Sequence, residues 1–361
     1  MNPELSVERI PPLFTCALPV EQTGAVGRLG KPGRGLASLP RLADLRRRRR
    51  AGGRGSLADQ QAGWSGRDAP LEYWFFRTSW AQGALLVDLI LRRDEGTVEL
   101  RVSSWNHGTA QIHRLVREYR AGPVSDPAQV VGGELTLRSS RGSCGPISWD
   151  LDFAITPTGL STPPAPWRQL ETFDLALTSW PVATATGTVT LDARTEELVS
   201  RPAMLCHYWG RELPRRWLWL SASDFDRPNV AVEVGVLRSK AWGRRVPLPA
   251  LGYGWLHDGT GTHSVASPIN GLIRYAPRPQ GGVNVSITGL AGRWQLQAWA
   301  ADQSFVHLGD GIAQSLSADL QLVNSSRPAA AHGTAVLEMR DEAWASTGPP
   351  TADPCRLFTV D

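Results

Sequence analysis

The chain has 361 residues, of which 42% are hydrophobic and 20% are charged, and it contains only four cysteines. This length and apolar fraction predict two or three folded domains and exclude a wholly disordered chain. The cysteines are scattered without a C-x-x-C pair, which disfavours a disulfide-rich scaffold and a cysteine-bound zinc site. No run of about 18 apolar residues and no signal peptide is recognisable, so we expect a cytoplasmic protein.

The basic charge is concentrated at the start of the chain. Residues 1–60 contain 11 basic and 5 acidic side chains and so carry a charge of +6. The net charge of the whole chain is +4, so the remaining residues carry −2. We therefore expect no nucleic-acid partner. Residues 1–60 are rich in Gly, Pro and Arg, which predicts a flexible N-terminal extension. The functional alternative is peripheral membrane contact through arginines 46–50, each adding about 1 kcal/mol on anionic lipid.

Strand patterns begin at residue 71. Residues 71–80, 84–91 and 97–103 are three strand-like runs, and Gly83 and Asp94-Glu95-Gly96 supply the turns between them. Residues 111–120 are the best candidate for a short helix. Further strands are predicted at 133–138, 148–153, 173–178 and 187–191. In residues 148–153 strict alternation predicts one buried and one solvated face.

The second half repeats this pattern, with strands predicted at 217–222, 230–236, 271–275, 283–287, 293–299, 316–323 and 333–339. Strands that recur about every 10–15 residues with turn signals between them indicate antiparallel barrels or sandwiches. A boundary near residues 195–205 divides the folded part into two similar halves. We predict an extension at 1–60 and two β-barrel domains at 61–200 and 201–361.

The most informative segment is residues 206–219. Its W-x-W places Trp217 and Trp219 on one face of a strand. Inside a barrel, such a face forms an apolar, π-rich wall that suits a flat or polyene ligand and stabilises a passing cation. The alternative is that these tryptophans only fill the core.

Three islands of sequence resemble a known family. Residues 209–219 fit the order and spacing of the motif N-W-G-x-x-[FL]-P-[RK]-[RK]-W-[FL]-W of the tocopherol cyclases. Residues 292–308 fit a downstream G-R-W-x-[IL]-x-A followed by V-x-L, and residues 74–77 fit an early W-[YF]-F-[KR] strand. The chain thus resembles the tocopherol cyclase-like, lipocalin-like superfamily, which also contains carotenoid 1,2-hydratases and Diels–Alderases.

The resemblance implies an all-β fold of two tandem lipocalin-like antiparallel barrels, with few short helices, around a hydrophobic cavity. It also implies proton-initiated or pericyclic chemistry without a metal or other cofactor. One acid, an apolar pocket and a few hydrogen-bond donors suffice for such chemistry. Trp74, Trp209, Trp217, Trp219, Trp294 and Tyr253 are the predicted substrate-binding residues.

The chain departs from the family at the expected acid. Many relatives carry an acidic residue two positions before the motif Asn, where this chain has Cys206, and the Asn itself is Tyr208. His207 falls where some Diels–Alderase-like relatives also have His. His207 and Tyr208 are therefore the first candidates for proton donation.

Asp224 and Asp226 are the candidate carboxylic acids. They stand two residues apart after the W-x-W strand, on one face if that strand continues, where burial would raise the pKa of one of them. The alternative is a turn before Pro228, since Asp is a common turn residue.

Other chemistries lack their sequence signals. The seven histidines show no HxH or HExxH spacing, so no metal site is predicted. Neither a nucleophile elbow nor a phosphate-binding loop is present.

The leading hypothesis is a cofactor-free cyclase, an isomerase or intramolecular lyase, that acts on an apolar polyene, prenylated or polyketide intermediate. The alternatives are a non-catalytic lipid or pigment carrier and an alkene hydratase of the carotenoid type.

Overall fold

The structure is a computed structural model that describes residues 70–119, 127–155, 160–162, 175–210, 212–238, 240–241, 246–247, 251–267, 269–278, 282–289, 292–323 and 328–341. The N-terminal extension predicted at residues 1–60, with its proposed membrane contact, lies outside these residues. Among the described helices, none is long and apolar enough to cross a membrane.

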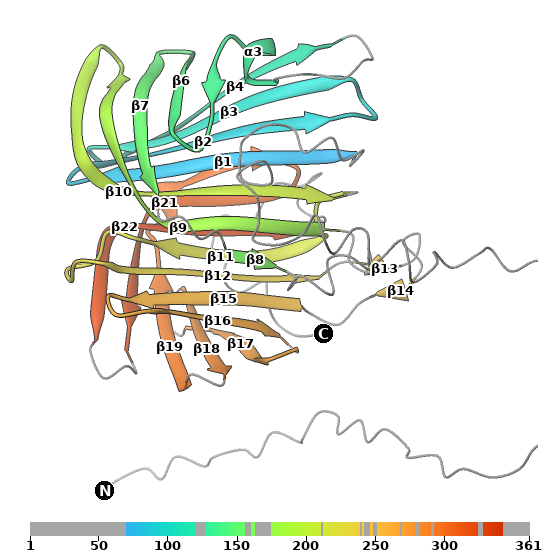
Figure 1. The fold of residues 1–361 in the computed structure, drawn as a ribbon, viewed down its shortest axis with the longest axis vertical. Coiled ribbons are helices and arrows are strands. Elements are labelled where there is room, and N and C mark those ends of the chain that lie inside the picture. Colours follow the sequence, from blue (N-terminus) through green and yellow to red (C-terminus); the bar gives the residue numbers. More distant parts are fainter. Residues whose placement is uncertain are drawn as a thin grey trace, which may run out of the picture. The chain divides into compact units, whose positions relative to one another are not determined.

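The first half of the described chain forms one ten-stranded antiparallel sheet (Figure 1). Its order is β4-β3-β2-β1-β10-β9-β7-β6-β5, with β8 paired to β9. The strands are β1 Leu71–Trp80, β2 Gly83–Arg92, β3 Thr97–Asn106, β4 Thr109–Glu118, β5 Glu134–Leu135, β6 Ser139–Cys144, β7 Ile147–Ile155, β8 Leu160–Thr162, β9 Leu175–Leu191 and β10 Arg194–Gly210, and the short helix α3 is Pro127–Val130.

The second half forms another ten-stranded antiparallel sheet, in the order β16-β15-β12-β11-β22-β21-β19-β18-β17, with β20 paired to β21. Its elements are β11 Arg216–Ala222, β12 Val230–Arg238, β15 Leu251–Asp258, β16 Thr262–Ser267, β17 Gly271–Pro277, β18 Val283–Gly289, β19 Gly292–Trp299, η1 Asp302–Ser304, β20 Phe305–Gly309, β21 Ile312–Leu322 and β22 Ala329–Asp341, beside a small pair of β13 Lys240–Ala241 and β14 Val246–Pro247.

The two sheets share one topology. In each, a four-stranded meander begins at a strand that also pairs with the last strand of the same sheet, β1 with β10 and β11 with β22. The prediction of two tandem, all-β, lipocalin-like barrels with few short helices is confirmed. The division predicted at residues 200 and 201 falls inside β10, and the chain leaves the first sheet only after Gly210.

Each barrel encloses an apolar core, and a third core lies between the two sheets. On β2, Leu85, Val87 and Leu89 face the core of the first barrel. Leu86, on the opposite face of β2, joins residues of both sheets in what we term the inter-sheet core: Phe75, Leu177, Met204, Cys206, Trp219, Leu237, Tyr253, Leu316 and Val336. Because side chains alternate along a strand, β2 must be apolar on both faces.

The prediction of a helix at residues 111–120 is wrong. Residues Thr109–Glu118 form strand β4, antiparallel to β3. His107 and Gly108 both have positive φ, 47° and 86°, which is the backbone of a tight hairpin turn. That turn returns the chain alongside β3. None of the side chains of this edge strand is buried, so β4 shows little of the alternation that would have marked it.

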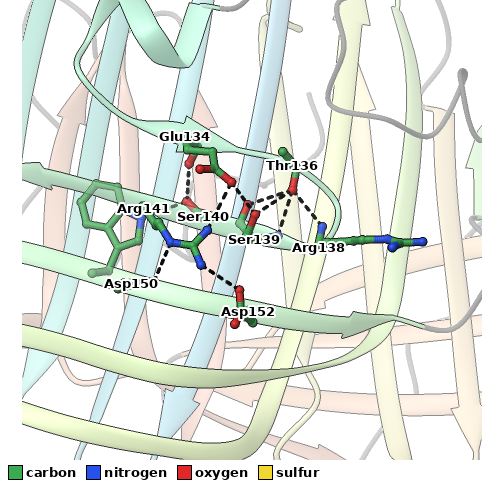
Figure 2. A network of polar contacts seen from close by, with 9 residues as sticks. Glu134, Thr136, Arg138, Ser139, Ser140, Arg141, Asp150 and Asp152 are labelled. Atoms are coloured by element: carbon green, nitrogen blue, oxygen red, sulfur yellow. Dashed lines mark hydrogen bonds and ion pairs between the residues drawn. The ribbon is translucent and has the colours of Figure 1, made fainter.

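A surface network holds the short strands of the first barrel to β7 (Figure 2). Arg141 on β6 pairs with Glu134 at 3.2 Å, Asp150 at 2.9 Å and Asp152 at 3.0 Å. Ser139 Oγ donates to Glu134 at 2.5 Å. Each exposed ion pair contributes little to the free energy of unfolding. The main effect of the network is therefore to align β5, β6 and β7.

Gly187 on β9 is the backbone position least able to accept a side chain. Its φ is +140°, and an added Cβ would lie 2.0 Å from the carbonyl oxygen of Asp150. We expect Gly187→Ala to lower the free energy of unfolding by about 3 kcal/mol or more, since β7 and β9 would have to separate. Chemical denaturation measures this loss.

Gly108→Ala is the control. Gly108 also has positive φ, +86°, but its Cβ would meet no atom within 4 Å. Only the conformational strain remains, which amounts to about 1 kcal/mol. Equal losses in the two variants would contradict the backbone clash at Gly187.

Candidate active site

A cavity of about 100 Å³ lies between the two sheets. Both sheets and the segment that joins them supply its walls, which are mostly apolar. The lining residues are Tyr73, Phe75, Leu86, Asp88, Ile90, Arg101, Leu177, Tyr208, Leu213, Pro214, Trp217, Leu218, Trp219, Gly235, Val236, Leu237, Tyr253, Ile312 and Glu338. A concave, mostly apolar space with a few polar groups is the usual form of a small-molecule site.

Asp88 brings a carboxyl group into this apolar space. It lies on β2 between Leu86 and Ile90, and its neighbours across the strands are Phe75 and Arg101. Asp88 is fully buried, and among the described residues neither of its oxygens has a hydrogen-bond partner of ordinary geometry. Burial raises the pKa of Asp88 to about 8, although Arg101 and the Tyr73 hydroxyl partly oppose the rise. At neutral pH the group is therefore mostly a neutral acid.

Arg101 only partly offsets the effect of burial on Asp88, because its guanidinium group is hydrogen-bonded to another carboxylate. Its Nε and Nη2 both donate to Glu99, each at 3.1 Å. Glu99 also accepts from Arg114 Nε at 2.7 Å. Burial opposes ionisation of Glu99, yet the two guanidinium groups hold its pKa below the ordinary value. The ionised form is therefore stabilised less at Asp88 than at Glu99.

Glu338 is the second carboxyl of the cavity and comes from β22 on the opposite sheet. Trp217 Nε1 donates to its Oε1 at 2.7 Å, and Gln314 Nε2 donates to its Oε2 at 2.5 Å. Burial raises the pKa of Glu338, while these two donors and Arg101 lower it.

Glu233 is a third buried carboxyl that fixes the aromatic wall. Oε1 accepts from Trp219 Nε1 at 3.0 Å and from the Tyr253 hydroxyl at 3.1 Å. Oε2 accepts from Ser179 Oγ at 2.6 Å and from Trp255 Nε1 at 2.9 Å. Burial raises the pKa of Glu233, and the four donors oppose that rise. Since Ser179 belongs to the first sheet, Glu233 also joins the two sheets.

Four of the residues predicted from sequence line the cavity: Tyr208, Trp217, Trp219 and Tyr253. Trp217 and Trp219 share a face, as the W-x-W spacing predicted. Tyr208 closes one side, where its hydroxyl donates to the carbonyl oxygen of Glu212 at 2.9 Å and its ring meets Tyr73 edge to face.

His207 and its neighbours lie elsewhere. The His207 ring stacks on Trp74, with 4.3 Å between ring centroids, and its Nε2 is 3.8 Å from a carboxylate oxygen of the buried Glu72. Trp209 lies beside it at 4.8 Å. Because alternate residues of β10 face opposite ways, Tyr208 points to the cavity and His207 points into the first barrel.

Asp224, Asp226 and Trp294 also lie outside the cavity lining. Asp224 accepts a long hydrogen bond from Ser79 Oγ, at 3.5 Å. Asp226 is joined to Ala330: its Oδ1 accepts from the Ala330 amide at 2.9 Å, and its own amide donates to the Ala330 carbonyl at 2.8 Å. This position matches the alternative of a turn. Trp294 belongs to the core of the second barrel.

Sequence reasoning missed Asp88, Arg101, Glu233 and Glu338. Three of them share a signal, which is a lone carboxylate within an apolar strand: Asp88 in residues 84–91, Glu233 in 230–236 and Glu338 in 335–339. When both faces of a strand are buried, a charged side chain is buried whichever face it lies on. It therefore needs a partner or a changed protonation state.

Within the described residues, no three His, Cys, Asp or Glu side chains are grouped so that they could hold a metal ion. The absence of a metal or other cofactor stays a prediction from the sequence.

No protein-family model matches the chain, and no curated protein matches it significantly. Two solved structures share its fold. One is a protein from Nitrosomonas europaea named "putative ATTH (NE1406)", with a TM-score of 0.52, 12% identity, and coverage of 76% of this chain and 93% of that one. The other is kievitone hydratase from Nectria haematococca, with a TM-score of 0.54, 13% identity, and coverage of 76% and 90%. These similarities show a shared fold of two antiparallel β-barrels and no more.

The raised pKa of Asp88 makes stability depend on pH. The folded state holds the proton up to about pH 8, whereas an ordinary Asp releases it near 3.8. The folded state therefore binds more protons over this interval, and its stability falls as the pH rises. Asp88→Asn removes this penalty, so the variant should gain stability relative to wild type between pH 5 and pH 8, each pKa unit corresponding to about 1.4 kcal/mol.

Chemical denaturation of both proteins at the two pH values measures this gain. The comparison with wild type cancels the contributions of the other titrating groups. A stability difference that does not change with pH would contradict a neutral Asp88.

Glu233→Gln should destabilise the protein by about 1–3 kcal/mol. An amide nitrogen cannot accept a hydrogen bond, and each Glu233 oxygen accepts from one indole N–H, which can only donate. One buried indole N–H is therefore left unpaired whichever way the amide turns. Denaturation and tryptophan fluorescence report the change. Glu134→Gln, in the exposed network of β5–β7, is the matched control and should change stability by less than about 0.5 kcal/mol.

Proposed function

We propose that the protein is a cofactor-free enzyme that protonates a carbon–carbon double bond of an apolar substrate, with Asp88 as the acid. The observation that carries the proposal is a fully buried carboxyl group, without a hydrogen-bond donor of ordinary geometry among the described residues, in the wall of a mostly apolar cavity. A general acid is most effective when its pKa lies near the working pH, and burial brings Asp88 into that range. The acid that the motif lacks at Cys206 would thus come from β2.

The aromatic walls suit the cation that protonation creates. Trp217 and Trp219 line the second-sheet side of the cavity and Tyr73 lies on the first-sheet side. Aromatic faces attract a desolvated cation, an interaction of about 2 kcal/mol or more per contact. Glu233 fixes the Trp219 ring, so this wall is ordered before the substrate binds.

Cyclisation is the product step that the cavity favours. The mostly apolar walls would hold the substrate in a folded conformation, and such positioning can supply about 7–11 kcal/mol of the barrier. A nucleophile within the substrate then captures the cation, and the product is an isomer of the substrate.

Hydration is the second candidate, and one observation favours it. Asp88, Arg101 and Glu338 add charged or ionisable groups to the mostly apolar lining of the cavity, and such groups can hold a water molecule. The fold is similar to that of a protein named kievitone hydratase. This similarity extends only to the fold and does not identify the reaction. An experiment is therefore needed to distinguish cyclisation from hydration.

The proposed partner is an apolar small molecule. A nucleic-acid partner is not proposed. Cytoplasmic location and membrane contact through arginines 46–50 remain proposals from the sequence.

Asp88→Asn tests the acid. The probes are linear isoprenoid alkenes and prenylated phenols, incubated with the full chain in D₂O. We expect wild type to give a product with one solvent deuterium on carbon, and the variant to lose about 10²–10⁴-fold in kcat because the amide cannot donate a proton of suitable acidity. Mass spectrometry separates an isomeric product from one that is heavier by a molecule of water.

Other outcomes would contradict the proposal. A cyclised product without deuterium, formed equally by both proteins, would indicate pericyclic chemistry. Probes that bind tightly to both proteins and return unchanged would indicate a carrier.

A further inference from the structure

Asp88 and Glu338 face the same cavity from different sheets, and their surroundings differ in hydrogen-bond donors. Both oxygens of Glu338 accept an N–H, from Trp217 and from Gln314. Among the described residues, neither oxygen of Asp88 has a donor of ordinary geometry. N–H donors stabilise the ionised form of a carboxyl group, so the negative charge is placed on Glu338 and the proton on Asp88.

The electrostatics of the cavity agree with this division. Burial raises the pKa of both carboxyl groups, and Arg101 lowers the pKa of both. The pair of N–H donors distinguishes Glu338, whose charge in turn raises the pKa of Asp88. An ionised Glu338 thus keeps Asp88 protonated. A neutral acid and a charged base stand on opposite walls of one small cavity.

We propose that Glu338 is the general base of the reaction. It would take the proton from the oxygen, of a substrate hydroxyl or of water, that adds to the carbon cation formed by Asp88. This proposal rests on the proposed function. It deepens that function by requiring a nucleophile with an O–H group.

The step is balanced without a co-reactant. The Asp88 proton forms a C–H bond at one alkene carbon, and the nucleophile oxygen forms a C–O bond at the other. The O–H bond of the nucleophile breaks and its proton passes to Glu338. Transfer of that proton back to Asp88, directly or through solvent, restores the starting state.

Glu338→Gln removes the base and leaves the wall intact. The new amide oxygen can still accept from Trp217 Nε1. Gln314 can reverse its own amide, because its Oε1 has no partner among the described residues and could accept from the new amide nitrogen. A role limited to holding Trp217 would therefore survive this substitution.

Infrared spectroscopy of the full chain at pH 7 tests the assignment without a ligand. Protonated carboxyl groups give a carbonyl band distinct from that of carboxylates. We expect one such band from a buried group in wild type, its loss in Asp88→Asn and its persistence in Glu338→Gln.

Each other result decides one proposal. A protonated-carboxyl band lost in Glu338→Gln overturns Glu338 as the base. If a band is also lost in Asp88→Asn, the acid of the proposed function stands. If Asp88→Asn loses no protonated-carboxyl band, both the proposed acid and the base inferred from it are overturned.

Turnover in D₂O supplies the mechanistic readout once one of the probes is converted. With Glu338→Gln we expect kcat to fall about 10²–10⁴-fold with little change in KM. The unreacted alkene should still acquire deuterium, because Asp88 continues to add and remove a proton. Unchanged kcat, or loss of the exchange together with turnover, would overturn the base role.

Discussion

The structure depends on one constraint, which is that the central strands of both sheets are buried on both faces. One face of β1, β2, β11 and β12 belongs to the core of its own barrel, and the other meets the opposite sheet. A polar group on the second face has no access to bulk water. It must find partners within the protein or change its protonation state. This requirement decides the chemistry of the cavity.

Three carboxyl groups meet the constraint in three ways. Among the described residues, Glu233 accepts four hydrogen bonds, Glu338 accepts two, and Asp88 accepts none of ordinary geometry. Hydrogen-bond donors stabilise a carboxylate, so the ionised form is stabilised most at Glu233 and least at Asp88. Glu233 therefore serves to fix the aromatic wall, and Asp88 is left with its proton. A neutral carboxylic acid against aromatic rings suits the generation and stabilisation of a carbon cation.

The fold alone does not identify this chemistry. The chain shares its two-barrel architecture with proteins of 12% and 13% identity. At that distance the barrels are a common scaffold, and the proposed reaction rests on the side chains of the inter-sheet cavity. Asp88 stands on β2, on the first-sheet side, while the motif residues that suggested a family stand on β10 and β11. The motif marks the aromatic wall, and Asp88, the proposed acid, lies on the sheet that faces it.

The sequence by itself determined the all-β tandem fold, because alternation and turn residues are local properties of the chain. It also placed Trp217 and Trp219 on one face, since the period of a strand fixes that relation. The sequence could not place His207 and Tyr208 on different sides of β10 relative to the cavity, because alternation separates neighbours without saying which face meets the other sheet. It could not identify Asp88 as the proposed acid, since its protonation state depends on burial, on the charge of Arg101 on β3 and on the carboxylate of Glu338 on β22. Only the docking of the two sheets brought these groups together.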